Sequence, residues 1–180
     1  RFGYLWTRKF QSESKGTLYG KKIVLTGGTS GIGKAAAFKL AEKNAFVTIV
    51  ARNRSKAELV CREIVEKTGN PHIDFLIADL GLMQDVRRVA QRLKASKKRI
   101  DILINNAGAL FTERKLTSEG LEQTFATDLL GVFLLTQYLK DALAQSQSGR
   151  IINVSSGGMY TQKIEVNDLE NSQGAYDGAK

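Results

Sequence analysis

Short apolar runs alternate with amphipathic segments along most of the chain. Five of these runs have the length and apolar character of buried strands, at 23–25, 45–51, 73–78, 100–104 and 151–154. Between them, apolar residues recur at helical spacing, which predicts helices over 32–43, 55–67, 83–95 and 118–144. A capping box formed by Ser55 and Glu58 marks the expected start of the second helix.

This alternation is typical of an α/β doubly wound fold, in which helices cover both faces of a parallel sheet. Continuous apolar strands fit that arrangement because both of their faces are buried. Right-handed crossovers bring the carboxyl ends of the strands to one edge of the sheet, and ligands of such folds bind at that edge. The residues directly after each strand are therefore the ones expected to carry the function.

Charge is distributed unevenly. The 180 residues carry a formal net charge of +9, yet the first 22 alone hold six basic residues against one acidic residue. Residues 1–20 form a basic and aromatic leader, which could lie on an anionic membrane surface or be a solvated arm. The domain itself is expected over residues 21–180. Because the chain begins with Arg1, its native N-terminus is expected to lie elsewhere.

Composition excludes several classes of protein. A hydrophobic share of 42% and a charged share of 25% are those of a globular domain. Cys61 is the single cysteine, and the sequence has no spacing of ligands that suggests a metal site. The domain has no stripe of alternating aromatic and basic residues, so nucleic acid is not an expected partner. Apolar runs are too short to cross a bilayer, and a cytoplasmic location, with or without membrane association, is expected.

A glycine-rich turn follows the first predicted strand. It has the sequence Thr26-Gly-Gly-Thr-Ser-Gly-Ile-Gly33 and lies between a strand and an Ala-rich helix. Glycines at this spacing allow a tight turn, close approach of the backbone to a pyrophosphate and close helix packing, while the amides of the helix N-terminus face the phosphates. The turn predicts a dinucleotide site with contacts from Gly27, Thr29, Ser30, Gly31, Ile32 and Gly33.

The end of the second strand bears on which dinucleotide binds. Sites for NAD(H) place a carboxylate there to hold the ribose hydroxyls, whereas this chain has Ala51-Arg-Asn-Arg54. A guanidinium binds phosphate through a planar fork and stacks on adenine. Arg52, with Arg54 beside it, therefore predicts NADP(H) as the cofactor and NAD(H) as the weaker ligand, unless both arginines are simply solvated.

Small and polar residues follow the third and fourth strands. Asp79 and Leu80 come where the adenine of a dinucleotide would lie, and Asn105-Asn-Ala-Gly108 follows the fourth strand. Small residues there let the chain pass beneath a nucleotide, and the asparagines could bridge strand ends or only form a turn. The candidate cofactor contacts of this region are Asp79, Leu80, Asn106, Ala107 and Gly108.

Together these motifs resemble those of the classical short-chain dehydrogenase/reductase family. The glycine turn, Asp79-Leu80, the N-N-A-G sequence and Ser155-Ser156 occur in family order over residues 21–180, and the retinol-dehydrogenase-like branch is similar. The resemblance implies a Rossmann-like fold and an NADP(H)-dependent oxidoreductase acting on a small-molecule carbonyl or alcohol of lipophilic character. It is compatible with a homo-oligomer. It also implies that the chain stops after strand five, without the family's last strands and substrate lid.

The resemblance also assigns two catalytic candidates. Ser156 is similar to the family serine that holds the substrate oxygen, unless it only caps a turn. Asp128 stands where the family has the asparagine of a proton relay. An ionised carboxylate accepts hydrogen bonds but cannot donate them, so Asp128 is either a weakened relay residue or a structural residue at a helix bend.

The family's tyrosine and lysine have two alternative positions. Tyr176 and Lys180 have the required spacing of four, which would place both on one helix face. The intervening Asp177-Gly178 favours a loop, however, so the pair could instead lie beyond residue 180. A protein that binds nucleotide but catalyses weakly or not at all is therefore the alternative function.

Overall fold

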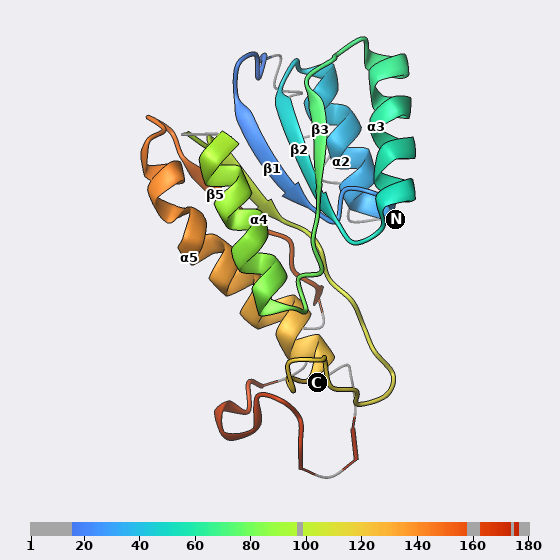
Figure 1. Cartoon of the computed structure of the whole chain (residues 1–180), viewed down its shortest axis with the longest axis vertical. Coiled ribbons are helices and arrows are strands. Elements are labelled where there is room, and N and C mark those ends of the chain that lie inside the picture. Colours follow the sequence, from blue (N-terminus) through green and yellow to red (C-terminus); the bar gives the residue numbers. More distant parts are fainter. Residues whose placement is uncertain (1–15, 97–98, 158–162, 174, 177–180) are drawn as a thin grey trace.

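A parallel sheet of five strands forms the centre of the molecule. The computed structural model describes residues 16–96, 99–157, 163–173 and 175–176. The strand order across the sheet is β3-β2-β1-β4-β5, so the first strand lies in the middle (Figure 1). The strand bounds are β1 Lys22–Thr26, β2 Phe46–Ala51, β3 Ile73–Ile77, β4 Ile102–Asn105 and β5 Arg150–Asn153.

Helices cover both faces of this sheet (Figure 1). Helices α2 and α3 pack on one face of the sheet, against β1, β2 and β3. Helices α4 and α5 pack against each other on the opposite face, and a π-helix, η1, leads directly into α5. The fold class expected from the sequence, a Rossmann-like α/β fold, is confirmed. The bounds are α2 Gly31–Glu42, α3 Arg54–Thr68, α4 Met83–Ser96, η1 Phe125–Leu130, α5 Gly131–Ala144 and the 3-10 helix η3 Val166–Asp168.

Apolar side chains fill two core layers, one on each face of the sheet. Ile23, Leu25 and Ile49 point to the layer beneath α2 and α3, whereas Val24 and Leu103 point to the layer beneath α4 and α5. The alternation along β1 buries both faces, as expected for a central parallel strand. β5 is the outermost strand beside β4 in the described sheet, and each of its residues is exposed.

Two expectations about helix starts are wrong. The second helix begins at Arg54 rather than Ser55, and its cap is Asn53, whose side chain accepts a hydrogen bond from the Lys56 amide at 2.9 Å. Asparagine is as good an N-cap as serine, and here it lies directly at the end of β2, where the chain turns. The helix expected from residue 118 begins only at Gln123, and its π-helical part, η1, begins at Phe125.

Residues 115–123 form a short hairpin that leads into this helix, and it is called the 115–123 hairpin below. The Thr117 amide donates to the Leu121 carbonyl at 2.7 Å, and Gly120 makes the turn with a φ of +80°. The Glu119 carboxylate reaches the start of α4 and accepts hydrogen bonds from the amides of Met83 at 2.6 Å and Gln84 at 3.1 Å. A carboxylate is favourable at a helix N-terminus, so this contact fixes the hairpin to α4.

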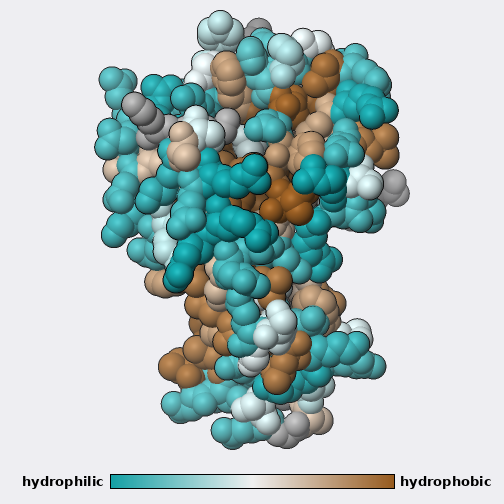
Figure 2. All heavy atoms as spheres, viewed as in Figure 1, coloured by the Kyte–Doolittle hydropathy of each residue, from teal (hydrophilic) through white to brown (hydrophobic). Residues whose placement is uncertain are grey.

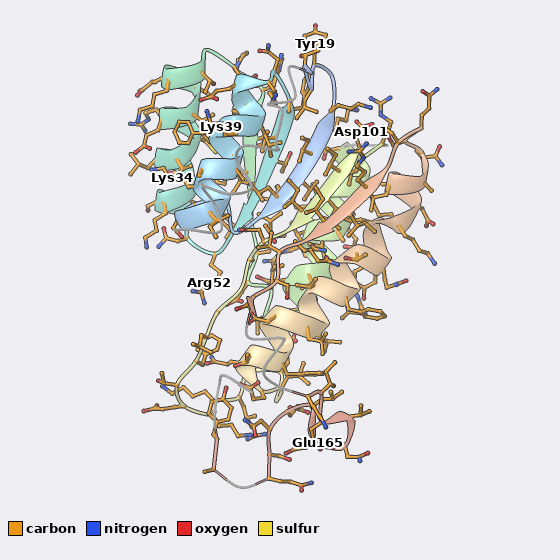
Figure 3. All side chains as sticks on the ribbon, turned by 180° about the vertical axis from the view of Figure 1, so that it is seen from behind. Tyr19, Lys34, Lys39, Arg52, Asp101 and Glu165 are labelled. Atoms are coloured by element: carbon orange, nitrogen blue, oxygen red, sulfur yellow. The ribbon has the colours of Figure 1, made fainter. Side chains whose placement is uncertain are left out.

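A buried carboxylate organises the opposite, amino-terminal edge of the sheet. Asp101 is 2% exposed and accepts hydrogen bonds from the Lys22 amide at 2.9 Å and the Ser146 hydroxyl at 2.6 Å. Lys21 and Arg99 lie 3.8 Å and 3.4 Å from the same carboxylate. Asp101 thus joins the starts of β1 and β4 to the loop after α5, at the end of the sheet opposite Arg52 (Figure 3).

The leader expected over residues 1–20 lies mostly outside the described residues, of which the first is Gly16. Lys180, one of the two alternative catalytic positions, lies outside them as well. Among the helices that the structure describes, none combines the length and apolar character needed to cross a membrane.

Candidate functional site

A large cavity lies at the carboxyl edge of the sheet. This cavity has a volume of about 580 Å³ and is bordered by residues that follow β1, β2, β3, β4 and β5. All twelve residues predicted to contact a cofactor lie around it, although they are spread over 82 positions of the sequence. They are Gly27, Thr29, Ser30, Gly31, Ile32, Gly33, Arg52, Asp79, Leu80, Asn106, Ala107 and Gly108.

Two glycines of the turn after β1 have no space for a side chain. A Cβ on Gly27 would lie 2.8 Å from the Ala107 Cα, and its φ of +69° is in the left-handed region. A Cβ on Gly33 would lie 2.3 Å from the Gly27 carbonyl oxygen and 2.4 Å from Asn106 Nδ2. The turn, the first helical residues and the loop after β4 are therefore packed backbone against backbone, as a close dinucleotide floor requires.

Thr26 and Asn106 connect the ends of β1 and β4. The Thr26 hydroxyl accepts hydrogen bonds from the amides of Asn106 at 3.0 Å and Ala107 at 2.9 Å. In return, Asn106 Nδ2 donates to the carbonyls of Thr26 at 3.0 Å and Gly27 at 3.3 Å. Asn106 therefore links strand ends rather than only forming a turn, which were the two readings the sequence left open.

The N-terminus of α2 borders the cavity and is suited to an anion. Ser30 occupies the N-cap position in extended conformation, and its side chain makes no capping hydrogen bond within the described part of the chain. The first turn of α2 contains no acidic residue. Free amides and the positive end of the helix dipole together favour a phosphate at this position. The donor set thus fits the pyrophosphate of a dinucleotide.

The two arginines after β2 have different surroundings. Arg52 borders the cavity and projects from the carboxyl edge of the sheet (Figure 3). Arg54 instead pairs with Glu58 at 3.6 Å, and its guanidinium carbon lies 5.8 Å from the centre of the Phe75 ring. Lys56, which the sequence reading missed, also borders the cavity. An N-cap at Asn53 places Lys56 on the first turn of α3, so recognising that cap in the sequence would have indicated its position.

A second, smaller cavity of about 170 Å³ continues the site beyond Arg52. Arg52, Asp79 and Thr127 border both cavities, and the 115–123 hairpin supplies Leu116 and Thr117 to the smaller one. The Asp79 carboxylate accepts a hydrogen bond from the Gly81 amide at 2.9 Å, which fixes its position. The expected adenine side of the site therefore has a wall that the sequence did not predict.

The catalytic candidates lie at the same edge but outside the lining of the large cavity. Val154 borders it at the end of β5, and Ser156 follows two residues later in an exposed position. Between β4 and β5, Asn105 Nδ2 donates to Asn153 Oδ1 at 2.8 Å and to the Thr136 hydroxyl at 3.1 Å. These contacts hold the ends of the two strands against α5.

Asp128 is half-buried in η1, whose π-helical hydrogen bonds span one residue more than those of an α-helix. Its Oδ1 accepts a hydrogen bond from the Ala109 amide at 2.9 Å, which ties the helix to the loop after β4. Burial raises the pKa of this carboxyl, the Ala109 hydrogen bond opposes that shift, and the nearby Glu122 charge adds to it. A π-helical turn often occurs at a functional site, and Asp128 combines a structural contact with a perturbed carboxyl.

Comparison with known proteins agrees with this geometry. A family model described as short chain dehydrogenase matches residues 21–167, and the chain belongs to the short-chain dehydrogenase/reductase family. Dehydrogenase/reductase SDR family member 12 of Bos taurus is 41% identical over 159 residues, covering 88% of this chain and 50% of the relative. Retinol dehydrogenase 13 of Homo sapiens is 36% identical over 156 residues, covering 87% of this chain and 47% of the relative.

Solved structures share the same fold. A short chain dehydrogenase from Escherichia coli CFT073 complexed with NADPH has a TM-score of 0.70 and 30% identity, covering 81% of this chain and 62% of that chain. The chain spans about half the length of the curated relatives it matches.

Proposed function

We propose that this chain is the cofactor-binding part of an NADP(H)-dependent oxidoreductase that interconverts a lipophilic carbonyl compound and its alcohol. The observation that carries the NADP(H) preference is the end of β2, where Arg52 borders both cavities and no carboxylate follows the strand. Lys56 adds a second positive charge on the same cavity. Two cations near the end of β2, where NAD(H) sites place a carboxylate, favour a 2′-phosphate over a free ribose hydroxyl.

Different residues of the cavity would bind different parts of the cofactor. The N-terminus of α2 and the turn from Gly27 to Gly33 would bind the pyrophosphate, Arg52 the 2′-phosphate, and Asp79 with Leu80 the adenine side. The bound nicotinamide supplies or accepts the hydride. Ser156 would donate a hydrogen bond to the substrate oxygen, which stabilises the charge that develops there.

A titration of the full-length protein with NADPH and NADH, followed by the fluorescence of the reduced nicotinamide, tests the preference. Arg52→Gln should weaken NADPH binding about 10- to 100-fold, the effect of losing one charge-assisted hydrogen-bonded pair, and should change NADH binding by less than about threefold. Arg54→Gln is the matched control, since Arg54 pairs with Glu58 outside the cavity, and should leave both affinities unchanged. Equal losses for NADPH and NADH in the Arg52 variant would contradict the proposal.

Two further parts of the proposal concern substrate and assembly. A retinol dehydrogenase among the relatives supports a lipophilic substrate. Leu129 and Phe133 are 52% and 55% exposed on η1 and α5, and Figure 2 shows hydrophobic residues along this part of the molecule. Such a face favours a homo-oligomer built on α5. Sedimentation of the full-length protein and of its Phe133→Glu variant tests this, because the substitution should produce monomers.

A specific observation supports a second candidate function, a nucleotide-binding protein with little or no catalysis. Asp128 replaces the relay asparagine, and its amide-accepting carboxylate cannot donate when ionised. Measuring NADPH affinity and NADPH-dependent turnover of a carbonyl probe on the same full-length sample separates the two functions. Binding with turnover favours the oxidoreductase, and tight binding without turnover over a broad aldehyde and ketone panel favours the alternative.

A further inference from the structure

A buried carboxylate lies at the start of η1, outside both cavities. Glu122 is 2% exposed. Its Oε1 accepts a hydrogen bond from the Thr124 amide at 2.8 Å, and its Oε2 accepts one from the Phe125 amide at 2.7 Å. These bonds satisfy amides that have no partner within the helix, so Glu122 fixes where η1 begins. Asp128 lies six residues after Glu122, and the charge of Glu122 raises the pKa of the Asp128 carboxyl.

Glu122 also holds the part of the chain that follows β5. The Tyr176 hydroxyl donates to Glu122 Oε1 at 3.0 Å and lies 2.8 Å from the Thr124 hydroxyl. The Glu122 amide donates to a carboxylate oxygen of Glu170 at 2.9 Å, and the Arg114 guanidinium donates to the Glu170 carbonyl at 3.4 Å. Residues 163–173 and 175–176, called the post-β5 segment below, are thereby tied to the 115–123 hairpin and to η1 (Figure 1).

This arrangement is the reverse of what a tyrosine needs to act as a general acid and base. Such a tyrosine requires a neighbouring cation that stabilises its phenolate. The single proton of the Tyr176 hydroxyl instead points to a carboxylate. Burial raises the pKa of Tyr176, and the hydrogen bond and charge of Glu122 raise it further. The Thr124 hydrogen bond and the Arg114 charge oppose this rise, but the pKa stays above its usual value. Tyr176 is also not among the residues that border either cavity.

We propose that Glu122 and Tyr176 are positioning residues, which dock the post-β5 segment on the start of the helix that carries Asp128. The Glu122 carboxylate caps η1 and also accepts a hydrogen bond from the Tyr176 hydroxyl. The start of η1 and the post-β5 segment are therefore fixed relative to each other. Thr127, which borders both cavities, and Asp128 lie on the first turns of this helix. The docking therefore sets the distance between the segment and the cofactor edge. The expected effect on turnover rests on the proposed function, whereas the docking itself does not.

Hydrogen exchange of the full-length protein tests the docking without any substrate. Tyr176→Phe removes the hydroxyl that donates to Glu122, and Glu122→Gln removes the charge and one of the two acceptor oxygens. Each substitution should accelerate amide exchange in residues 163–173, by about tenfold or more for Tyr176→Phe. Tyr19→Phe is the matched control, since Tyr19 is 76% exposed at the opposite end of the sheet (Figure 3), and should leave exchange unchanged. Exchange that stays unchanged in Tyr176→Phe overturns the proposal.

Turnover distinguishes a positioning role from a catalytic one, with NADPH and nonanal as the probe pair. We expect Tyr176→Phe to raise the KM for nonanal about three- to tenfold while kcat stays within about threefold. A fall of kcat by about 100-fold or more, the loss typical of a missing general acid, would make Tyr176 a catalytic residue and overturn the proposal. If the unaltered protein does not reduce nonanal, that result bears on the proposed function, and hydrogen exchange alone decides the docking.

Discussion

Thr26→Val isolates the contact that joins β1 to β4. The Thr26 side chain is fully buried, and its hydroxyl accepts hydrogen bonds from the amides of Asn106 at 3.0 Å and Ala107 at 2.9 Å. It also lies 3.4 Å from the Ile104 carbonyl, to which it donates. Valine has nearly the same shape, so the substitution removes these hydrogen bonds while disturbing the packing little.

The expected loss follows from the two donors left without an acceptor. An unsatisfied buried donor costs about 1–3 kcal/mol, and because both amides are only partly buried we expect a total loss of about 3 kcal/mol. Thr48 supplies a matched control on the neighbouring strand. It too is fully buried, and among the described residues its hydroxyl has no hydrogen-bond partner. Thr48→Val should therefore leave the free energy of unfolding unchanged or raise it by about 1 kcal/mol.

Urea unfolding of the full-length protein and both variants, followed by circular dichroism, gives these free energies. The slope of the free energy with urea should be the same for all three proteins, so that the midpoints can be compared directly. The reasoning would be refuted if Thr26→Val unfolded at the same urea concentration as the unaltered protein, or if Thr48→Val cost as much as Thr26→Val.

Two further predictions concern carboxylates whose pKa is shifted in opposite directions. Burial raises the pKa of Asp101, but hydrogen bonds from Lys22 and Ser146 bring it below the usual value, so Asp101 stabilises the fold above about pH 4 and this contribution disappears as pH falls through the lowered pKa. Asp101→Asn should cost about 2 kcal/mol in urea unfolding at pH 7, and a cost unchanged at pH 2 would contradict this. Burial raises the pKa of Asp128, so its charged form destabilises the fold above that pKa. Asp128→Asn should therefore raise the free energy of unfolding at pH 7, and this gain should disappear below about pH 4, where the carboxyl is protonated in both states. A lower free energy of unfolding for Asp128→Asn at pH 7 would contradict this prediction.

Sequence could predict the strands and the composition of the large cavity because both follow from local patterns. The strands are apolar runs, and the observed bounds differ from the expected ones by one or two residues at most ends. The twelve cofactor candidates all follow strand ends, and a parallel sheet brings those ends together whatever their separation in sequence. Whether they bind a cofactor stays a prediction.

The substrate side was harder to predict because long-range contacts decide its structure. The apolar stripe that predicts a helix starts at Phe125, and residues 118–124 were expected to extend that helix toward its N-terminus. The Glu119 carboxylate instead binds the start of α4, 35 residues earlier in the chain. Glu122 likewise binds Tyr176, 54 residues later. No local pattern shows these pairings, and they convert the expected first turns of a helix into the 115–123 hairpin. Tertiary contacts override local preference there.

The position of β1 in the middle of the sheet has a consequence for the rate of folding. β1, β2 and β3 pair in sequence order, so they can associate through loops of moderate length. β4 must then pair with β1, and the Thr26–Ile104 hydrogen bond closes a separation of 78 residues. Closing long loops in a parallel sheet is slow. Because residues from both sides of this pairing border the cavity, affinity for nucleotide should appear only in the last phase of refolding.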